Sequence, residues 1–350
     1  MEIARALEHN ALWQLTRART MGFLREPEAV FWVFVFPILL ALALGIAFRT
    51  QKPQPLPVGV AAGTTAAVRE ALATAAELRV VPLASDAEAE RALRNGTIVA
   101  LVHGEAGASR VVYDPTRQEN QLARMLIEDT LQRAAGREDP ARIEAITRTQ
   151  RGTRYIDFLL PGLIGMNLLG TGMWGVGFPI ATARQQKLLK RYMATPMRRG
   201  EYLLSFLFAR LLWLLLEVAA LCLFGRLVFG IGMNGSWPAF ISVVLAGALS
   251  FSALGLLVVS RAKTIEAVSG LMNVAMLPMW LLSGTFFASS RFPQVVQPFV
   301  QALPLTAVNN SLRALMNDGL GFAAVTPSLA LLAAWGLVSF VVALRIFRWE

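Results

Sequence analysis

Long apolar segments alternate with short polar segments over most of this chain. A helix that crosses a bilayer needs about 20 mostly apolar residues. Segments of this kind lie at 29–48, 158–183, 203–229, 237–260, 267–290 and 319–344. Because lipid offers no hydrogen-bond partner, the backbone of each segment must satisfy itself as a helix. The pattern predicts a polytopic α-helical membrane protein with six transmembrane helices.

Residues 49–155 interrupt this pattern with short strand and helix patterns in turn. Strand patterns lie at 56–62, 78–84, 97–104 and 109–115, and helix patterns at 66–77, 86–96 and 117–135. In the last helix pattern, Leu122, Met125, Leu126 and Leu131 recur near helical spacing. Alternating strands and helices are typical of an α/β domain. We predict an inserted α/β domain between the first and second spans.

The chain is 55% hydrophobic and has a formal net charge of +10. Its bases gather in the short segments after the second, fourth and sixth spans, beside apolar runs. That distribution is typical of cytoplasmic loops and argues against a nucleic-acid partner. It predicts a multi-pass protein with both termini cytoplasmic and residues 49–155 extracytoplasmic. The single cysteine, Cys222, excludes a disulfide within the chain.

The most basic short segment, residues 184–201, lies between the second and third spans. Within it, Leu188, Leu189, Tyr192 and Met193 recur at spacings of three and four and would form one apolar helix face. Proline at 196 would end or kink that helix. Two interpretations remain open and are compatible. The bases follow the positive-inside rule, or the segment docks on a partner, in which case the apolar face is needed too.

Polar side chains inside the predicted spans are candidates for function. Glu217 lies near the middle of the third span, where a carboxylate is costly. Arg210 precedes it by seven residues and shares its helix face within about 20°. We expect Glu217 to pair with Arg210 or with a polar group on another helix; a direct role in substrate passage is the alternative. Asn167 and Asn273 are expected to form interhelical hydrogen bonds.

Other segments limit the chemistry. Residues 291–318 are interrupted by prolines and predict short re-entrant or interfacial helices at the outer leaflet. The glycine-rich run 162–177 lies inside a span and lacks the lysine of a phosphate loop, so we interpret its glycines as packing positions. His9 and His103 fall on opposite sides of the membrane. We therefore expect no metal site, no catalytic residues and no cofactor in this chain.

Four stretches carry a family resemblance. They are LTRARTMGFLREPEAVFWVFVFPILLAL, the α/β stretch around ERALRNGTIVALVHGEAG, LLKRYMATPMRRGEYLL, and LLSGTFFASSRFPQVVQPFVQALPLTAVNNSLRALMNDG. In this order and spacing they resemble the membrane (permease) subunit of type-2 ATP-binding-cassette exporters, in the group with a large extracellular domain after the first span. Two features of the family's coupling segment are absent: a glutamate near Gln185, and a Gly-Lys pair near Ser205–Phe206.

The resemblance implies a domain plan and functional residues. The plan is a cytoplasmic interfacial helix at 1–28, the first span at 29–48, the extracytoplasmic α/β domain at 49–155, and the remaining spans at 156–350. The implied ATPase-coupling residues are Lys187, Leu188, Leu189, Arg191, Tyr192, Met193, Thr195, Pro196, Arg198 and Arg199. The implied outer gate residues are Ser283, Gly284, Phe286, Pro304 and Arg313.

The resemblance also implies a function in a bacterial plasma (inner) membrane. The chain would be the subunit of an ATP-driven exporter that moves an amphiphilic or hydrophobic substrate, such as a drug, an antibiotic or a lipid. Two copies of a cytosolic ABC ATPase would bind ATP and Mg, and a second permease copy or a sibling permease would complete the transporter within membrane lipid. A periplasmic or cell-envelope partner is a further candidate. The alternative is a membrane-anchored sensor or scaffold whose α/β domain binds a ligand or a partner protein; a secondary transporter would need an inverted repeat.

Overall fold

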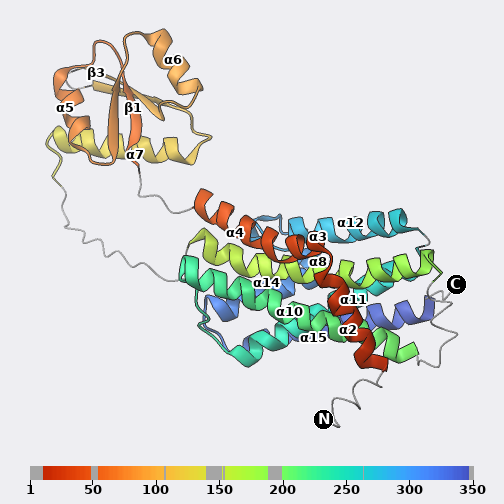
Figure 1. Ribbon diagram of the computed structural model, residues 1–350. Helices are drawn as coiled ribbons and strands as arrows, with labels where there is room; N and C mark the ends of the chain where they lie inside the picture. Colours follow the sequence, from red (N-terminus) through yellow and green to blue (C-terminus); the bar gives the residue numbers. More distant parts are fainter. Residues whose placement is uncertain are drawn as a thin grey trace. The chain divides into compact units, whose positions relative to one another are not determined.

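The computed structural model describes residues 11–48, 54–105, 108–138, 152, 154–187, 199–262 and 264–346. The chain divides into two compact units. The membrane unit comprises Met1–Arg49 and Thr149–Glu350, and the inserted unit comprises Thr50–Arg148. The sequence prediction of six membrane helices with an α/β insertion after the first is confirmed (Figure 1).

Among the described residues of the membrane unit, six helices are long and apolar enough to cross a membrane. They are Pro27–Ala47, α8 (Tyr155–Gln185), the Leu211–Phe229 part of α10 (Arg199–Phe229), α11 (Trp237–Val259), α12 (Ile265–Leu282) and α15 (Phe322–Ile346). The fifth span is shorter than the expected 267–290. It ends at Leu282 because Gly284, at φ +73°, takes the left-handed conformation that commonly follows a helix end.

The first span is an irregular helix. It consists of α3 (Pro27–Val30), a π-helical turn η1 (Phe31–Val35) and α4 (Phe36–Ala47). A separate helix, α2 (Ala11–Leu24), precedes it. Pro27 lies in the first turn of α3, where a missing N–H has no helical acceptor to lose. The chain therefore changes direction between α2 and the first span.

Helix α8 is the centre of the membrane unit. It contacts α4, α10, α11, α12 and α14 (Pro304–Met316), and 78% of its most apolar stretch is buried, against 17% for the first and sixth spans. Glycine permits the closest approaches. A Cβ on Gly172 would lie 2.7 Å from the Cβ of Phe251, and one on Gly255 would lie 2.7 Å from the Met173 carbonyl oxygen. These contacts agree with the interpretation of the glycine-rich run as packing positions.

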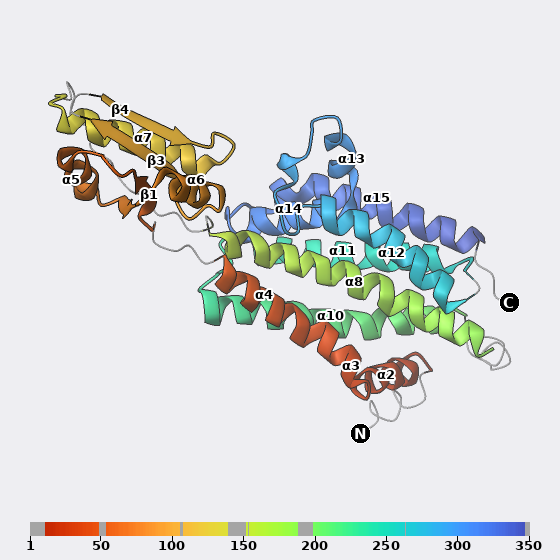
Figure 2. The ribbon, with the colours of Figure 1, turned by 90° about the horizontal axis from the view of Figure 1, so that it is seen from above.

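Three short helices connect α12 to α15. They are the 3₁₀ turn η2 (Ser289–Arg291), α13 (Gln297–Ala302) and α14. None has the length of about 20 residues that a span requires, since the longest, α14, has 13. Even so, α14 is almost entirely buried, and it lies beside α15 (Figure 2). The membrane unit thus encloses a short helix that does not cross it.

The inserted unit is built on a four-stranded sheet with the order β2-β1-β3-β4. Its strands are β1 (Leu56–Val60), β2 (Leu78–Pro82), β3 (Ala100–Glu105) and β4 (Ala108–Tyr113). Strand β1 pairs in parallel with β2 and β3, and β4 closes an antiparallel hairpin with β3. The sheet is therefore mixed, with strands β2 and β4 at its edges.

Helices cover both faces of this sheet. Helices α5 (Ala66–Thr74) and α7 (Gln118–Ala134) pack on one face, and α6 (Asp86–Arg94) packs on the other. The sequence predicted α7 but not its orientation. Its buried side chains are Asn120, Ala123 and Ile127, whereas Leu122 and Met125 are 52% and 61% exposed. The unit therefore has a core of its own.

Candidate functional site

Most of the predicted coupling segment lies outside the described residues. That holds for Leu188, Leu189, Arg191, Tyr192, Met193, Thr195, Pro196 and Arg198. Arg199 is described only as the first backbone position of α10. Lys187 is the last described residue before the gap, and its φ of +58° lies in the left-handed region typical of a position just after a helix end. The structure thus gives the two flanks of the segment.

Arg184 attaches one of these flanks to the fourth span. Its Nη1 donates to the carbonyl oxygens of Val259, at 2.9 Å, and Ala262, at 2.7 Å. Val259 is the last residue of α11, where carbonyls lack intrahelical donors. The guanidinium supplies one. The end of α8 that leads into the predicted coupling segment is therefore tied to the end of α11.

Helix α2 packs on the other flank, at the start of α10 (Figure 1). Arg19 Nε donates to Ser205 Oγ at 2.9 Å, and Ser205 is fully buried. The rings of Phe23 and Trp213 lie with centroids 4.6 Å apart. Because α10 begins inside the predicted segment 184–201, α2 contacts the helix into which that segment leads.

Glu217 lies in a polar cluster formed by the first three spans. Its side chain is 2% exposed. Glu217 Oε2 is 3.4 Å from Asn167 Nδ2 and 3.3 Å from Thr171 Oγ1. Asn167 Nδ2 also lies 3.3 Å from the Val33 carbonyl oxygen in η1. The cluster therefore joins α10, α8 and the irregular part of the first span.

Of the other two intramembrane candidates, only Asn273 has a described side chain. The side chain of Arg210 lies outside the described part of the chain, so its pairing with Glu217 stays a prediction. Asn273 lies on the exposed face of α12, and its expected interhelical hydrogen bond is not found among the described residues. The structure thus brings Asn167 and Glu217 together and leaves Asn273 apart.

Arg313, on α14, holds the loop that follows α12. Its Nε donates to the Phe158 carbonyl oxygen at 3.2 Å, and its Nη2 donates to the Gly284 carbonyl oxygen. The guanidinium carbon lies 3.7 Å from the centroid of the Phe158 ring. Phe158 is in the first turns of α8, so one arginine links α8, α14 and the loop. The described residues supply no carboxylate partner for it.

The remaining predicted gate residues lie around the same loop. Tyr155, at the start of α8, donates its hydroxyl to the Phe286 carbonyl oxygen at 3.2 Å. Asn309 Nδ2 donates to the Ser283 carbonyl oxygen at 2.9 Å. Pro304 begins α14, as expected from its fixed φ. The structure therefore gathers Ser283, Gly284, Phe286 and Arg313 around the start of α8.

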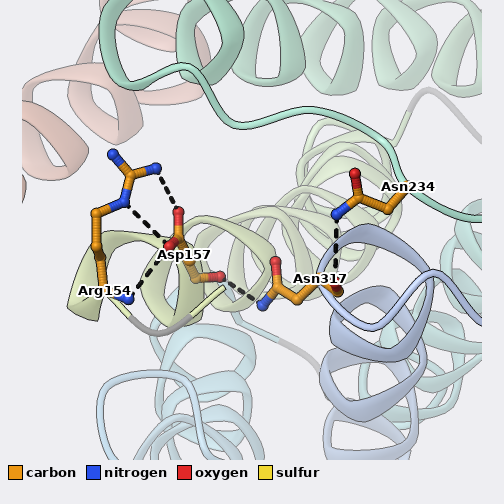
Figure 3. Close-up of polar contacts among 4 residues, drawn as sticks. All are labelled: Arg154, Asp157, Asn234 and Asn317. Atoms are coloured by element: carbon orange, nitrogen blue, oxygen red, sulfur yellow. Dashed lines mark hydrogen bonds and ion pairs between the residues drawn. The ribbon is translucent and has the colours of Figure 1, made fainter. Parts of the chain in front are cut away.

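Sequence reasoning missed several residues of this region. Asn309 is fully buried. Asp157 is held by Arg154 through side-chain bonds of 2.8 and 3.1 Å, and its carbonyl oxygen accepts from Asn317 Nδ2 at 2.8 Å (Figure 3). The Asn317 carbonyl accepts in turn from Asn234 Nδ2 at 3.2 Å, in the turn between α10 and α11 (Figure 3). The spacing of Arg154 and Asp157 is a local signal of a helix start. The contact between Asp157 and Asn317 joins residues 160 apart in the chain and has no signal in the sequence.

The chemistry that these groups offer is hydrogen bonding and packing. The described part of the chain contains no group of three or more His, Cys, Asp or Glu side chains that could hold a metal ion. The polar groups instead connect helices: the Glu217 cluster joins three spans, and the Arg313 region joins α8, α14 and the loop after α12. Such contacts can fix or release helix positions.

Residues 28–345 match the family described as ABC-2 family transporter protein. The chain belongs to this family. This ABC-2 family protein is 25% identical over 173 residues to the inner membrane transport permease YhhJ of Escherichia coli (strain K12), covering 49% of this chain and 46% of the relative. The same values hold for the YhhJ permease of Shigella flexneri. It is also 25% identical over 184 residues to ABC transporter G family member 20 of Dictyostelium discoideum, covering 51% of this chain and 25% of that protein.

The match thus spans about half the length of the permease relatives. The family match and the six helices together show that the chain is a multi-pass membrane protein and a transmembrane subunit of an ABC-2 type transporter.

Proposed function

We propose that this chain is the permease subunit of an ATP-driven exporter whose separate ATPase docks on residues 184–201. The observation that carries the proposal is the family match over 28–345, which includes the coupling segment and all six spans. The contact between α2 and the start of α10 supports it further. An ATPase that pushes the coupling segment would move α10 and, through it, α2.

The substrate proposed is amphiphilic or hydrophobic, such as a drug, an antibiotic or a lipid. The six spans of the membrane unit are predominantly apolar. A substrate of this class can enter from the cytoplasm or the inner leaflet and leave on the other side. The cluster at Arg313 would then lie near the exit, where it would hold the loop after α12.

The proposed assembly includes ATPase subunits, because an ABC-2 permease domain lacks the ATPase domain. Two copies of a cytosolic ABC ATPase would bind ATP and Mg, and a second copy of this chain or a sibling permease would complete the transporter. Both termini would face the cytoplasm, and the inserted unit would lie outside the inner membrane. That orientation places the basic short loops inside.

The test is purification of the tagged chain from its native membrane, followed by identification of the proteins that come with it. A variant with Tyr192→Asp and Met193→Asp should lose the ATPase, because the two charges fall on the proposed apolar docking face. The matched control is Leu122→Asp with Met125→Asp, which places the same charges on two exposed apolar residues of the inserted unit. The control should retain the ATPase.

The alternative function, a membrane-anchored sensor or scaffold, draws support from the inserted unit. That unit has a core of its own and exposes Leu122 and Met125 side by side on α7. A sensor needs no ATPase. Recovery of some other protein that is lost only from the Leu122→Asp, Met125→Asp variant, with no ATPase in any preparation, would favour this alternative and contradict the exporter.

A further inference from the structure

The π-helical turn of the first span follows from the position of Pro37. Proline has no N–H, so the α-helical bond from residue 37 to the Val33 carbonyl cannot form. In place of a regular turn the chain forms η1, in which the Phe36 N–H bonds to the Phe31 carbonyl five residues back. A freed carbonyl inside a membrane needs another donor, such as a side chain of a neighbouring helix.

Asn167 of α8 supplies that donor. Its Nδ2 lies 3.3 Å from the Val33 carbonyl oxygen and 3.4 Å from Glu217 Oε2. A primary amide has two N–H groups, so one side chain can serve both acceptors. Because both neighbours are acceptors, the NH₂ end of the amide must be the end that faces them. Asn167 therefore bridges the first span to the third.

Glu217 orients this amide. The hydroxyl of Thr171 lies 2.5 Å from the backbone carbonyl oxygen of Asn167 and 3.3 Å from Glu217 Oε2. A hydroxyl has one proton to donate, and the shorter contact is the stronger hydrogen bond, so Thr171 donates to the backbone carbonyl of Asn167. The amide of Asn167 thus remains as a donor that links the carboxylate to Val33. If α10 carried Glu217 away, the amide would lose the acceptor that keeps it in place.

Helix α10, which bears Glu217, also contacts the joint between α2 and the first span. These contacts come from Ser205 and Trp213, which precede Glu217 by 12 and four residues and so lie about 120° and about 40° from it around the helix. Ser205 accepts from Arg19 of α2. The Trp213 ring contacts Phe23 of α2, at 4.6 Å, and Phe34 of η1, at 6.1 Å between centroids. Any displacement of α10 therefore acts on both sides of this joint.

We propose that Asn167 is a positioning residue that locks the π-turn of the first span, and that Glu217 makes the lock respond to movement of α10. With the lock closed, the Val33 carbonyl is satisfied and the first span keeps one bend angle at η1. With the lock open, the carbonyl has lost its neighbouring donor and the bend at η1 changes, which changes the distance from α2 to the end of α4. The link to ATP rests on the proposed function, whereas the lock itself does not.

The lock is tested by a double-mutant cycle between Asn167→Leu and Pro37→Ala. Alanine at 37 restores the N–H that the Val33 carbonyl lacks, so Asn167 should become dispensable in that background. Spin labels at Ala18→Cys in α2 and Ile46→Cys at the end of α4, both exposed, measure the distance across the joint. Cys222 is first changed to alanine, and the labelled chain is diluted with unlabelled chain in lipid nanodiscs. Ser242→Ala is the control, since it removes a side-chain hydrogen bond within α11, to the Pro238 carbonyl oxygen.

The parent and Ser242→Ala should give one narrow distance. Asn167→Leu should shift the population towards a second distance about threefold, the factor that corresponds to an average interhelical hydrogen bond in a membrane. Adding Pro37→Ala should restore the single distance. If Asn167→Leu does not accumulate, its recovery by Pro37→Ala is the same result. An unchanged distance in Asn167→Leu, or an effect equal in both backgrounds, would overturn the lock.

The response to α10 is tested in the chain purified with its ATPase, using a non-hydrolysable ATP analogue and Mg²⁺. The analogue should move the parent to the second distance, and Asn167→Leu should already occupy it in part. A parent that keeps one distance with the analogue bound contradicts the response to α10. Failure to recover any ATPase contradicts the proposed function, and the distances in the nucleotide-free chain still decide the lock.

Discussion

Arg313 shows how a charged side chain can be kept inside a membrane unit with no acidic partner among the described residues. Its donors point to two backbone carbonyls, and its plane stacks on the Phe158 ring. A guanidinium carries five N–H groups in a rigid fork and accepts stacking on its face, whereas an ammonium is a single point of charge. The side chain therefore suits a position where one group must hold the loop after α12 against α8.

Replacing Arg313 should loosen this loop. Arg313→Met should lower the free energy of unfolding by about 1.5–3 kcal/mol, the range for a hydrogen bond to a charged group. Arg313→Lys should fall between methionine and the parent, since lysine keeps the charge but loses the fork and the stacking. Thermal unfolding in detergent measures both. Arg291→Met, at an exposed arginine of η2, should leave the midpoint unchanged, and an equal loss there would refute a specific role for Arg313.

At the scale of elements, apolar length was enough to predict the six spans, and strand and helix patterns were enough to predict the inserted sheet. The errors have local causes. The fifth span ends early because Gly284 takes a left-handed conformation. Helix α7 packs Asn120, Ala123 and Ile127 against the sheet and leaves Leu122 and Met125 outside. Leu126 and Leu131 are partly buried. Exposure depends on what packs against a helix, and spacing alone cannot show that.

The candidate site was predictable only in part for the same reason. Glu217 and Arg313 stand out because charges in apolar surroundings are rare. Their partners are backbone carbonyls and amides contributed by distant segments, such as Val33 to Asn167 and Gly284 to Arg313. Every residue has a backbone carbonyl, so the sequence does not show which carbonyl takes part in such a contact. Pro37 alone marks which carbonyl is free, and even that does not show which neighbour will bind it.

Two helix starts in the inserted unit give a matched test of local capping. Ser85 caps α6: its Oγ accepts from the Glu88 N–H at 3.3 Å, while Glu88 Oε2 accepts from the Ala84 N–H at 3.0 Å. Thr65 occupies the same position before α5 but makes no side-chain cap bond, and its buried hydroxyl has no partner among the described residues. The two caps should therefore respond differently to alanine.

Ser85→Ala should destabilise the inserted unit by about 1 kcal/mol, the usual cost of a lost cap. Thr65→Ala should be neutral or slightly stabilising, because it removes a buried hydroxyl that gains nothing from the fold. Hydrogen exchange of the full chain measures this locally: amides in the first turn of α6 should exchange faster in Ser85→Ala, and those of α5 should not change in Thr65→Ala. Equal protection of α6 with and without Ser85 would show that its cap contributes little.

At the scale of the whole molecule, the exposed faces of the membrane unit must meet either lipid or another protein. Leu271, Val274, Leu277 and Leu281 on α12 are 49–71% exposed, which suits lipid and protein alike. Asn273 lies among them. An amide inside a bilayer is costly when it faces acyl chains, and such groups almost always face protein or water. The position of Asn273 therefore argues that protein or water, and not acyl chains alone, covers this part of α12.

If Asn273 lies near the two-fold axis of a contact along α12, it would face the same residue of the partner copy, because residues of such an interface meet their own copies only at the axis. In a Cys222→Ala background, Asn273→Cys should then form a covalent dimer under mild oxidation, since a disulfide needs Cα atoms within about 7 Å. Leu337→Cys, 66% exposed on α15, should remain monomeric under the same conditions. Cross-linking only through residue 337 would place the partner on α15. An absence of cross-linking at both positions would argue that lipid covers α12. In that case the amide of Asn273 would have to be satisfied by water or substrate in the membrane, which a water-soluble thiol reagent would detect as labelling of Asn273→Cys.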